Sequence, residues 1–412
     1  MMMADKIFDP GAVSRLPDPL PALRDLQDQD RVHWSPRYKA WLVTRYDDVR
    51  AGLNDPRMTP GRAMPDPRVF EPGFREVFAD YRRLLDPFML FRDPPDHTRL
   101  RGLVNRGFTP SAIEALRPRV AIFVDELLAA MPARGTLDFV PSFAYPLPAR
   151  VIAELIGVPE DILDDLKRWS DGFATSTAGT GEDLFRRAAV ATSEMGAYLD
   201  EFIAHRREKP GGAIIDALID ARDGQYRLSA DELVANLILF LFAGHETTTN
   251  LLSNGLRTLL RNPGVLEDLR ANLDDPALVR NTVEEMLRHD GALFMSMRVA
   301  LQSFEWHGRQ IEKGQRVFLY HLSANRDPRV FDEPDRFDIR RKDASRHIAF
   351  GYGIHFCLGA PLAKLEVEVA LPALLRRYPG LALVDESVAW KTNFVLRGPT
   401  SLMLRAEGSA GA

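Results

Sequence analysis

The sequence contains the run Phe350-Gly351-Tyr352-Gly353-Ile354-His355-Phe356-Cys357-Leu358-Gly359, and Cys357 is the only cysteine of the 412-residue chain. The three glycines of this run tolerate positive φ and let a backbone approach a flat partner closely. Residues 360–371 then have helical propensity and apolar residues at helical spacing, with Pro361 in the first turn. The pattern predicts a structured loop that holds Cys357 ahead of a helix N-terminus, where the dipole and free N–H groups lower the pKa of a thiol.

A lone cysteine is more often an inert core residue than a functional one, and this alternative stays open from the residue type alone. With no second cysteine, the chain cannot form an internal disulfide, a CxxC redox pair or a multi-thiolate metal site. His355 lies two residues before Cys357 and is poorly placed to act as the base of a nucleophilic pair. A single soft ligand beside an aromatic ring and an imidazole suits one axial bond to haem iron.

The run resembles the cysteine-ligand loop of the cytochrome P-450 family, Phe-Gly-x-Gly-x-[His/Arg]-x-Cys-x-Gly, and it matches all six fixed positions. The resemblance implies that Cys357 binds the iron of haem b as its axial ligand. It also implies a mostly α fold with small β-sheets, an α+β chain arranged as a triangular helical prism around the buried haem. Cofactor contacts are expected from the other motif positions, which are Phe350, Gly351, His355 and Gly359.

Composition and charge restrict the class of protein. The chain is 45% hydrophobic and 27% charged, an ordinary globular balance, and its net charge of −5 gives no overall basic field for nucleic acid. No N-terminal apolar segment of the signal-peptide type and no apolar run of about 18 residues is present. We therefore expect a cytoplasmic monomer that binds neither nucleic acid nor membrane. One domain over residues 1–412 is the simplest division, with an extended segment over residues 1–30 and a first strand near residues 39–44.

His97 and Arg101 are spaced i and i+4 after a proline stop, so both should project from one helical face and could bind the same anion. A solvated basic face is the alternative for such a pair in isolation. In the family that the chain resembles, this His-x-x-x-Arg binds a haem propionate. The same resemblance assigns the second propionate to Arg298, together with His355.

A long helix is predicted from the capping box Ser229-Ala230-Asp231-Glu232 to about Arg261. Its centre carries a glycine, a carboxylate and three threonines where an apolar helix would be expected to continue. A helix end or a satisfied polar patch are alternatives. Thr247 lies one turn beyond Ala243, so its hydroxyl can bond a carbonyl of the preceding turn and open a local groove.

This segment resembles the family's oxygen-activation motif, [Ala/Gly]-Gly-x-[Asp/Glu]-Thr. The resemblance implies that Glu246 and Thr247 relay protons, and that Gly244, next to Ala243, allows close approach to the haem. Because this pair is present, an enzyme that uses dioxygen is favoured over family members that lack it and consume peroxide.

A Glu-x-x-Arg motif, Glu285 and Arg288, is by itself usually a surface pair of little energetic weight. In the family it is buried and joined by an arginine from a later Pro-x-Arg-Phe segment, which here gives Arg336. We expect the three residues to be structural.

The resemblance as a whole implies a monooxygenase that inserts one atom of O2 into a C–H bond of an apolar small molecule, such as a terpenoid, steroid, fatty acid, polyketide or aromatic compound. Electrons would come from NAD(P)H through a separate ferredoxin reductase and ferredoxin, and we expect the ferredoxin to dock near Arg106 and Arg346. A peroxide-driven hydroxylase and a haem-binding sensor or carrier without turnover are the alternatives. Candidate pocket residues are apolar: Phe88, Leu90, Leu237, Leu241, Phe294, Met295, Met297 and Phe394.

Overall fold

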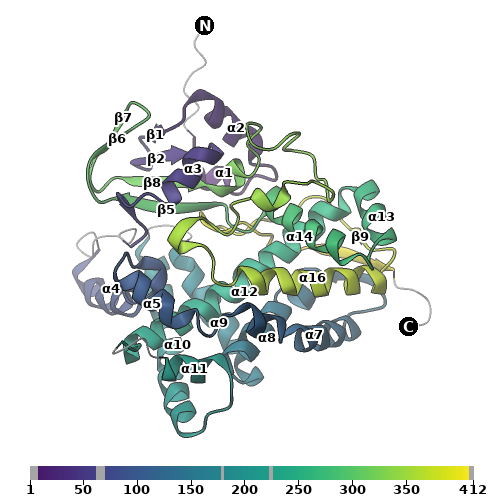
Figure 1. Ribbon diagram of the computed structural model, residues 1–412, viewed down its shortest axis with the longest axis horizontal. Helices are drawn as coiled ribbons and strands as arrows, with labels where there is room; N and C mark the ends of the chain where they lie inside the picture. The colour runs from purple at the N-terminus through teal and green to yellow at the C-terminus, as the bar shows by residue number, and fades with distance from the viewer. Residues whose placement is uncertain (1–7, 62–69, 178–180, 222–225, 408–412) are drawn as a thin grey trace.

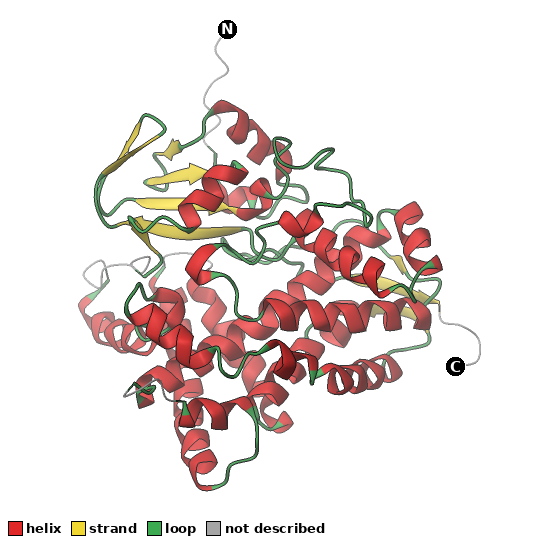
Figure 2. Ribbon diagram, in the orientation of Figure 1, coloured by secondary structure: helices red, strands yellow, loops and turns green. Residues whose placement is uncertain are grey.

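The computed structural model describes residues 8–61, 70–177, 181–221 and 226–407. Helices fill most of the molecule, and the strands of the largest sheet gather at one corner (Figures 1 and 2). This arrangement confirms the predicted mostly α fold with small sheets.

The α-helices have the following bounds: α1 Pro10–Val13, α2 Leu20–Gln29, α3 Tyr46–Leu53, α4 Pro72–Leu85, α5 Asp96–Val104, α6 Pro110–Glu114, α7 Arg117–Ala130, α8 Pro146–Ile156, α9 Leu163–Ala174, α10 Glu182–Glu208, α11 Ile214–Asp220, α12 Ala230–Leu260, α13 Pro263–Ala271, α14 Pro276–Asp290, α15 His321–Ala324 and α16 Ala360–Arg377. The strands are β1 His33–Ser35, β2 Ala40–Val43, β3 Met58–Thr59, β4 Arg134–Asp138, β5 Met295–Ala300, β6 Phe304–Trp306, β7 Arg309–Ile311, β8 Arg316–Tyr320, β9 Ala382–Leu383 and β10 Met403–Glu407. A short 3-10 turn, η7, spans Gly353–His355.

Helix α12 runs through the centre of the molecule (Figure 1). The predicted capping box is present, because Ser229 Oγ accepts from the Glu232 N–H at 3.1 Å and Glu232 Oε2 accepts from the Ser229 N–H at 2.9 Å. The same Glu232 carboxylate pairs with Arg99 of α5. Nearly all of α12 is buried, and it packs against α8, α10 and α14. The predicted long helix is therefore confirmed, with its N-terminus tied to α5.

The five-stranded sheet has the order β1-β2-β8-β5-β3, in which only β2 and β8 are parallel. Successive side chains of β2 and β8 alternate between two apolar clusters, as expected for a sheet buried on both faces. Strand β5 places Arg298 opposite Val317 of β8. The sheet thus fixes this arginine against a rigid scaffold.

The N-terminal segment differs from the prediction. Residues 1–7 lie outside the described residues, but α1 and α2 occupy much of residues 10–29, so the segment is not extended. Leu23 and Leu26 of α2 are buried at helical spacing. The prolines that indicated an extended chain instead stand at or near helix starts, where a missing N–H costs nothing.

Within the described part of the chain, none of the helices has the length and apolar character required to cross a membrane.

Candidate active site

The cysteine loop folds as the glycine pattern predicted. The Cys357 N–H donates to the Phe350 carbonyl at 2.9 Å, which closes the loop, and Gly351 and Gly353 have φ of 77° and 76°. A Cβ at Gly353 would also lie 2.3 Å from Asn54 Oδ1, so a side chain there would clash. The loop runs directly into α16, which begins at Ala360 after Gly359 as its N-cap.

Cys357 is accessible to solvent, and both desolvation and positive charge act on its sulfur. Desolvation raises the pKa of the Cys357 thiol above its ordinary value, and the backbone N–H groups of Gly359 and Ala360, together with Arg101, act in the opposite direction. The sequence predicted a net lowering of this pKa, which is wrong for the thiol in this structure, because desolvation outweighs the helix N-terminus. A cation bound at the sulfur favours the thiolate, so these N–H groups and Arg101 suit a metal-ligating thiolate.

Four basic side chains from three elements converge near this loop: His97 and Arg101 of α5, Arg298 of β5 and His355 of η7. The imidazole rings of His97 and His355 are 4.3 Å apart between centroids. Burial, followed by the charge of Arg101, lowers the pKa of His97. Burial and the neighbouring basic groups lower the pKa of His355 to about 3, and burial lowers that of Arg298 to about 10.

The cationic cluster has little charge compensation from the described residues. His97 Nε2 and His355 Nε2 are buried with no hydrogen-bond partner, and no ion pair of Arg101 or Arg298 is found among residues 8–61, 70–177, 181–221 and 226–407. Asp93 is the acid whose charge acts on His97 and on Arg298. Buried cations and unpartnered imidazole nitrogens fit an anionic ligand with two carboxylates, such as haem. The residues present therefore fit the cofactor that the sequence implied.

At the centre of α12, the Thr247 hydroxyl bonds a carbonyl of the preceding turn, as its spacing from Ala243 predicted. Thr247 Oγ1 donates to the Ala243 carbonyl at 2.8 Å, and Thr248 Oγ1 donates to the Gly244 carbonyl at 3.2 Å. Such bonds to the preceding turn slightly destabilise a helix and often bend it. α12 nevertheless continues without interruption to Leu260, so the alternative of a helix end at this point is wrong.

Gly244 lies at a close contact between two helices. A Cβ at this position would lie 2.7 Å from Ile152 Cγ1 of α8, so the missing side chain lets α8 and α12 pack closely. The glycine is therefore needed for contact between α8 and α12, and close approach to a haem stays a prediction.

Glu246 is partnered by a residue that sequence reasoning missed. Lys391 Nζ donates to Glu246 Oε1 at 2.7 Å and to Asn250 Oδ1 at 3.1 Å. Lys391 is 145 residues away in the sequence and belongs to no motif, so no local pattern could have identified it.

The Glu-x-x-Arg pair is fully buried, as predicted, with Arg288 Nε donating to Glu285 Oε2 at 2.7 Å. The third arginine is not Arg336, whose side chain is exposed and pairs with Glu333 at 3.0 Å. Arg341 takes that place, with Nε at 3.4 Å from Glu285 Oε1 and a buried side chain. Arg336 contributes only its backbone carbonyl, which accepts from Arg288 at 3.1 Å.

The eight candidate pocket residues fall into separate groups. Phe88, Leu237 and Leu241 lie in the main core, where Phe88 stacks on Phe91 with 5.8 Å between ring centroids. Leu90 is exposed. Contact with a substrate stays a prediction for all of these residues.

The other four residues belong to the cluster on one face of the sheet: Phe294, Met295, Met297 and Phe394. Phe294 is fully buried and packs edge-on against Tyr320. The ring of Phe394 contacts that of Tyr38 and lies where a Cβ at Gly11 would clash. The structure thus gives Phe294 and Phe394 packing roles.

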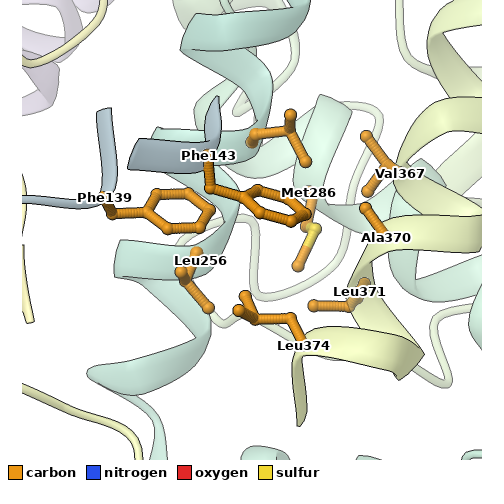
Figure 3. Close-up of a pocket in the computed structure, with 9 residues that line it drawn as sticks. Phe139, Phe143, Leu256, Met286, Val367, Ala370, Leu371 and Leu374 are labelled. Atoms are coloured by element: carbon orange, nitrogen blue, oxygen red, sulfur yellow. The ribbon is translucent and has the colours of Figure 1, made fainter. Parts of the chain in front are cut away.

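A small apolar cavity of about 10 Å³ lies between α12, α14 and α16, and Cys357 is not among the residues that line it (Figure 3). The rings of Phe139 and Phe143 lie beside Met286 on one side of it, and side chains of α16 lie opposite. A space of this size holds about one water and has no polar lining, so it is a packing defect and not a substrate site.

Comparison with known proteins agrees with these features. Residues 161–396 match the family described as Cytochrome P450. Cytochrome P450 monooxygenase PikC of Streptomyces venezuelae is 40% identical over 411 residues, covering 97% of this chain and 94% of PikC. The 6-deoxyerythronolide B hydroxylase of Saccharopolyspora erythraea is 39% identical over 374 residues, covering 90% of this chain and 91% of the hydroxylase. The crystal structure of myxobacterial cytochrome P450 CYP267B1 with myristic acid has a TM-score of 0.87 and 36% identity, covering 98% of this chain and 99% of that one.

Proposed function

The chain belongs to the cytochrome P450 family and is a monooxygenase, an oxidoreductase that uses O2, and from this premise we propose that it hydroxylates a C–H bond of an apolar small molecule, with haem b bound through Cys357. The observation that carries the assignment is the convergence of one cysteine sulfur with a buried cationic cluster whose imidazole nitrogens lack partners. Haem b bound in this way requires a thiolate ligand for its iron and basic partners for its two propionate carboxylates.

Bound haem supplies the activation of dioxygen and the oxidation of the C–H bond. The chain's own residues hold it. Cys357 presents its sulfur from the closed loop, and the N–H groups of Gly359 and Ala360 stabilise negative charge on that sulfur. We propose that His97 and Arg101 bind one propionate and that Arg298 and His355 bind the other; the contact between the His97 and His355 rings supports a shared site.

We propose that residues at the centre of α12 supply protons. The Thr247 hydroxyl is bonded to the Ala243 carbonyl, and Glu246, the preceding residue, provides a carboxyl that exchanges protons with solvent. Peroxide-driven turnover needs no such relay, and a haem-binding carrier needs no acid at this point. The presence of the pair supports dioxygen as the oxidant over both alternatives.

The substrate class is inferred from apolar residues and from relatives. Leu237 and Leu241 are buried in the half of α12 that precedes Thr247, and Phe88 belongs to the same apolar cluster. One relative is named for hydroxylation of 6-deoxyerythronolide B, and one solved structure holds myristic acid. We propose a bulky apolar compound of polyketide, terpenoid, steroid, aromatic or fatty-acid type, oxidised in the cytoplasm by the monomer with electrons from NAD(P)H through a ferredoxin reductase and a ferredoxin.

The test is turnover under ¹⁸O2. The purified protein, reconstituted with a ferredoxin, its reductase and NADPH, is incubated with a panel of apolar compounds chosen by their spin-state shift. One labelled oxygen atom per product molecule is the expected result. Product formed only when hydrogen peroxide replaces the reductase system would favour the peroxide-driven alternative, and haem binding without any product would favour the carrier.

A further inference from the structure

Lys391 joins two residues of α12 that stand one turn apart. Its ammonium donates to Glu246 Oε1 at 2.7 Å and to Asn250 Oδ1 at 3.1 Å. The Lys391 side chain is 24% exposed and that of Glu246 only 12%, so the ammonium is the more solvent-accessible end of the pair. Lys391 therefore stands where water reaches the carboxylate.

The backbone that carries Lys391 is fixed against α12. The Lys391 N–H donates to the Gly398 carbonyl at 3.0 Å, which closes the turn over residues 391–398. A Cβ at Gly398 would lie 2.0 Å from Asn250 Oδ1, so the base of this turn presses directly on the helix. The ammonium is thereby held within reach of one turn of α12 only.

The preceding residue is anchored as well. The ring of Trp390 contacts two guanidinium groups, with Arg397 at 3.4 Å and Arg257 at 5.4 Å from its centroid. Trp390 also forms an isolated antiparallel bridge with Pro399. A lysine on an anchored turn loses less side-chain freedom on pairing than one on a loose loop, which favours a persistent contact.

The ion pair of Lys391 with Glu246 fixes the position of the carboxylate and adds little to the free energy of folding. Partly exposed ion pairs contribute about 0–1 kcal/mol to folding. Lys391 binds only Oε1 of Glu246, and no hydrogen bond to Oε2 is found in the described part of the chain. One carboxylate oxygen of Glu246 is thus fixed by Lys391, and the other is available for proton exchange.

We propose that Lys391 is a positioning residue for proton delivery: it fixes the Glu246 carboxylate at the solvent boundary of α12, so that this acid takes protons from water and presents them toward Thr247. The inference rests on the proposed role of Glu246.

The test compares Lys391→Met, which removes the charge, with Lys391→Arg, which keeps it, and with Glu246→Gln. Lys313→Met is the matched control, because Lys313 is an exposed lysine of the turn between β7 and β8 with no side-chain partner among the described residues. Each holoenzyme is reduced by NADPH through a plant-type ferredoxin and its reductase, and the hydrogen peroxide formed per NADPH oxidised is measured. Thermal midpoints, imidazole affinity from the Soret shift and the crystal structure of Lys391→Met are readouts independent of turnover.

Lys391→Met is expected to raise the peroxide fraction roughly three- to tenfold, because a misplaced acid delivers protons poorly. The peroxide fractions of Lys391→Arg and Lys313→Met should stay near that of the parent. In the Glu246→Gln background, Lys391→Met should not raise the peroxide fraction further. The thermal midpoint and the imidazole affinity should not change, and the Glu246 carboxylate should have left its position in the crystal structure.

Several results would overturn the inference. One is a peroxide fraction of Lys391→Met equal to that of the parent, and another is an increase by Lys391→Met that adds fully to the increase caused by Glu246→Gln. A Glu246 carboxylate that keeps its position in the crystal structure of Lys391→Met would also overturn it. So would a loss of thermal stability or imidazole affinity in proportion to the increase in peroxide. A parental peroxide fraction in Glu246→Gln itself would instead remove the proposed proton relay, and the role of Lys391 with it, while leaving the thiolate assignment intact.

Discussion

Replacing Arg341 by alanine should destabilise the protein, whereas replacing Arg336 should not. The Arg341 guanidinium donates to the carbonyls of Asp332 at 2.6 Å, Glu333 at 3.0 Å and Arg336 at 3.3 Å, and it lies 3.4 Å from the buried carboxylate of Glu285. Three carbonyl bonds at about 0.5–1.5 kcal/mol each give a loss of about 2–4 kcal/mol, to which the weakened charge compensation of Glu285 adds.

The Arg336 side chain is exposed, and alanine at this position keeps the carbonyl that Arg288 and Arg341 use. Urea unfolding followed by tryptophan fluorescence, with the ratio of Soret to 280 nm absorbance as a measure of haem loading, separates the two variants. Arg341→Ala should unfold at lower urea and retain less haem, and Arg336→Ala should match the parent. Equal losses in both variants, or a larger loss in Arg336→Ala, would refute the assignment of Arg341 to this network.

Three further predictions follow from individual side chains. Thr247→Ala should keep haem and substrate binding but divert reducing equivalents to hydrogen peroxide, and an unchanged product yield per NAD(P)H would contradict the role of its hydroxyl. Gly244→Ala should lower the free energy of unfolding by about 1–3 kcal/mol, because its methyl group would overpack against Ile152. Adding Ile152→Ala should recover part of this loss. Reduced haem affinity at parental stability would instead indicate that the glycine is needed for close approach to the cofactor. Burial lowers the pKa of His321 to about 4, below the unfolded value of about 6.5, so the unfolded chain binds more protons between these values. The free energy of unfolding should therefore decrease as the pH is lowered from 6.5 to 4, by up to about 1.4 kcal/mol per pH unit. His321→Gln should make this fall shallower in urea titrations, and an identical slope would count against a neutral buried His321.

Local patterns predicted the parts of the site whose chemistry lies within a few residues. The glycines around Cys357, the capping box at Ser229 and the i, i+4 spacing of Thr247 and Ala243 each encode a backbone conformation or a neighbour on the same helix. In these cases the interacting groups are fixed by one element, so sequence spacing is enough.

Contacts between distant segments were not predictable in this way. Lys391 reaches Glu246 only because the 391–398 turn presses on α12, and Arg341 replaces Arg336 because the path of the chain turns the Arg336 side chain to solvent. The sign of the Cys357 pKa shift depended on burial, which one helix end does not reveal. That residues 1–412 form one domain stays a prediction.

The most direct test of the central claim, haem ligation by Cys357, is the carbon monoxide difference spectrum of the dithionite-reduced protein and of Cys357→His. If Cys357 binds the iron, the parent should show a Soret band strongly shifted to the red, as thiolate ligation gives, and Cys357→His should lack this band. An imidazole-type band in the parent, or a purified parent protein that binds no haem, would contradict it.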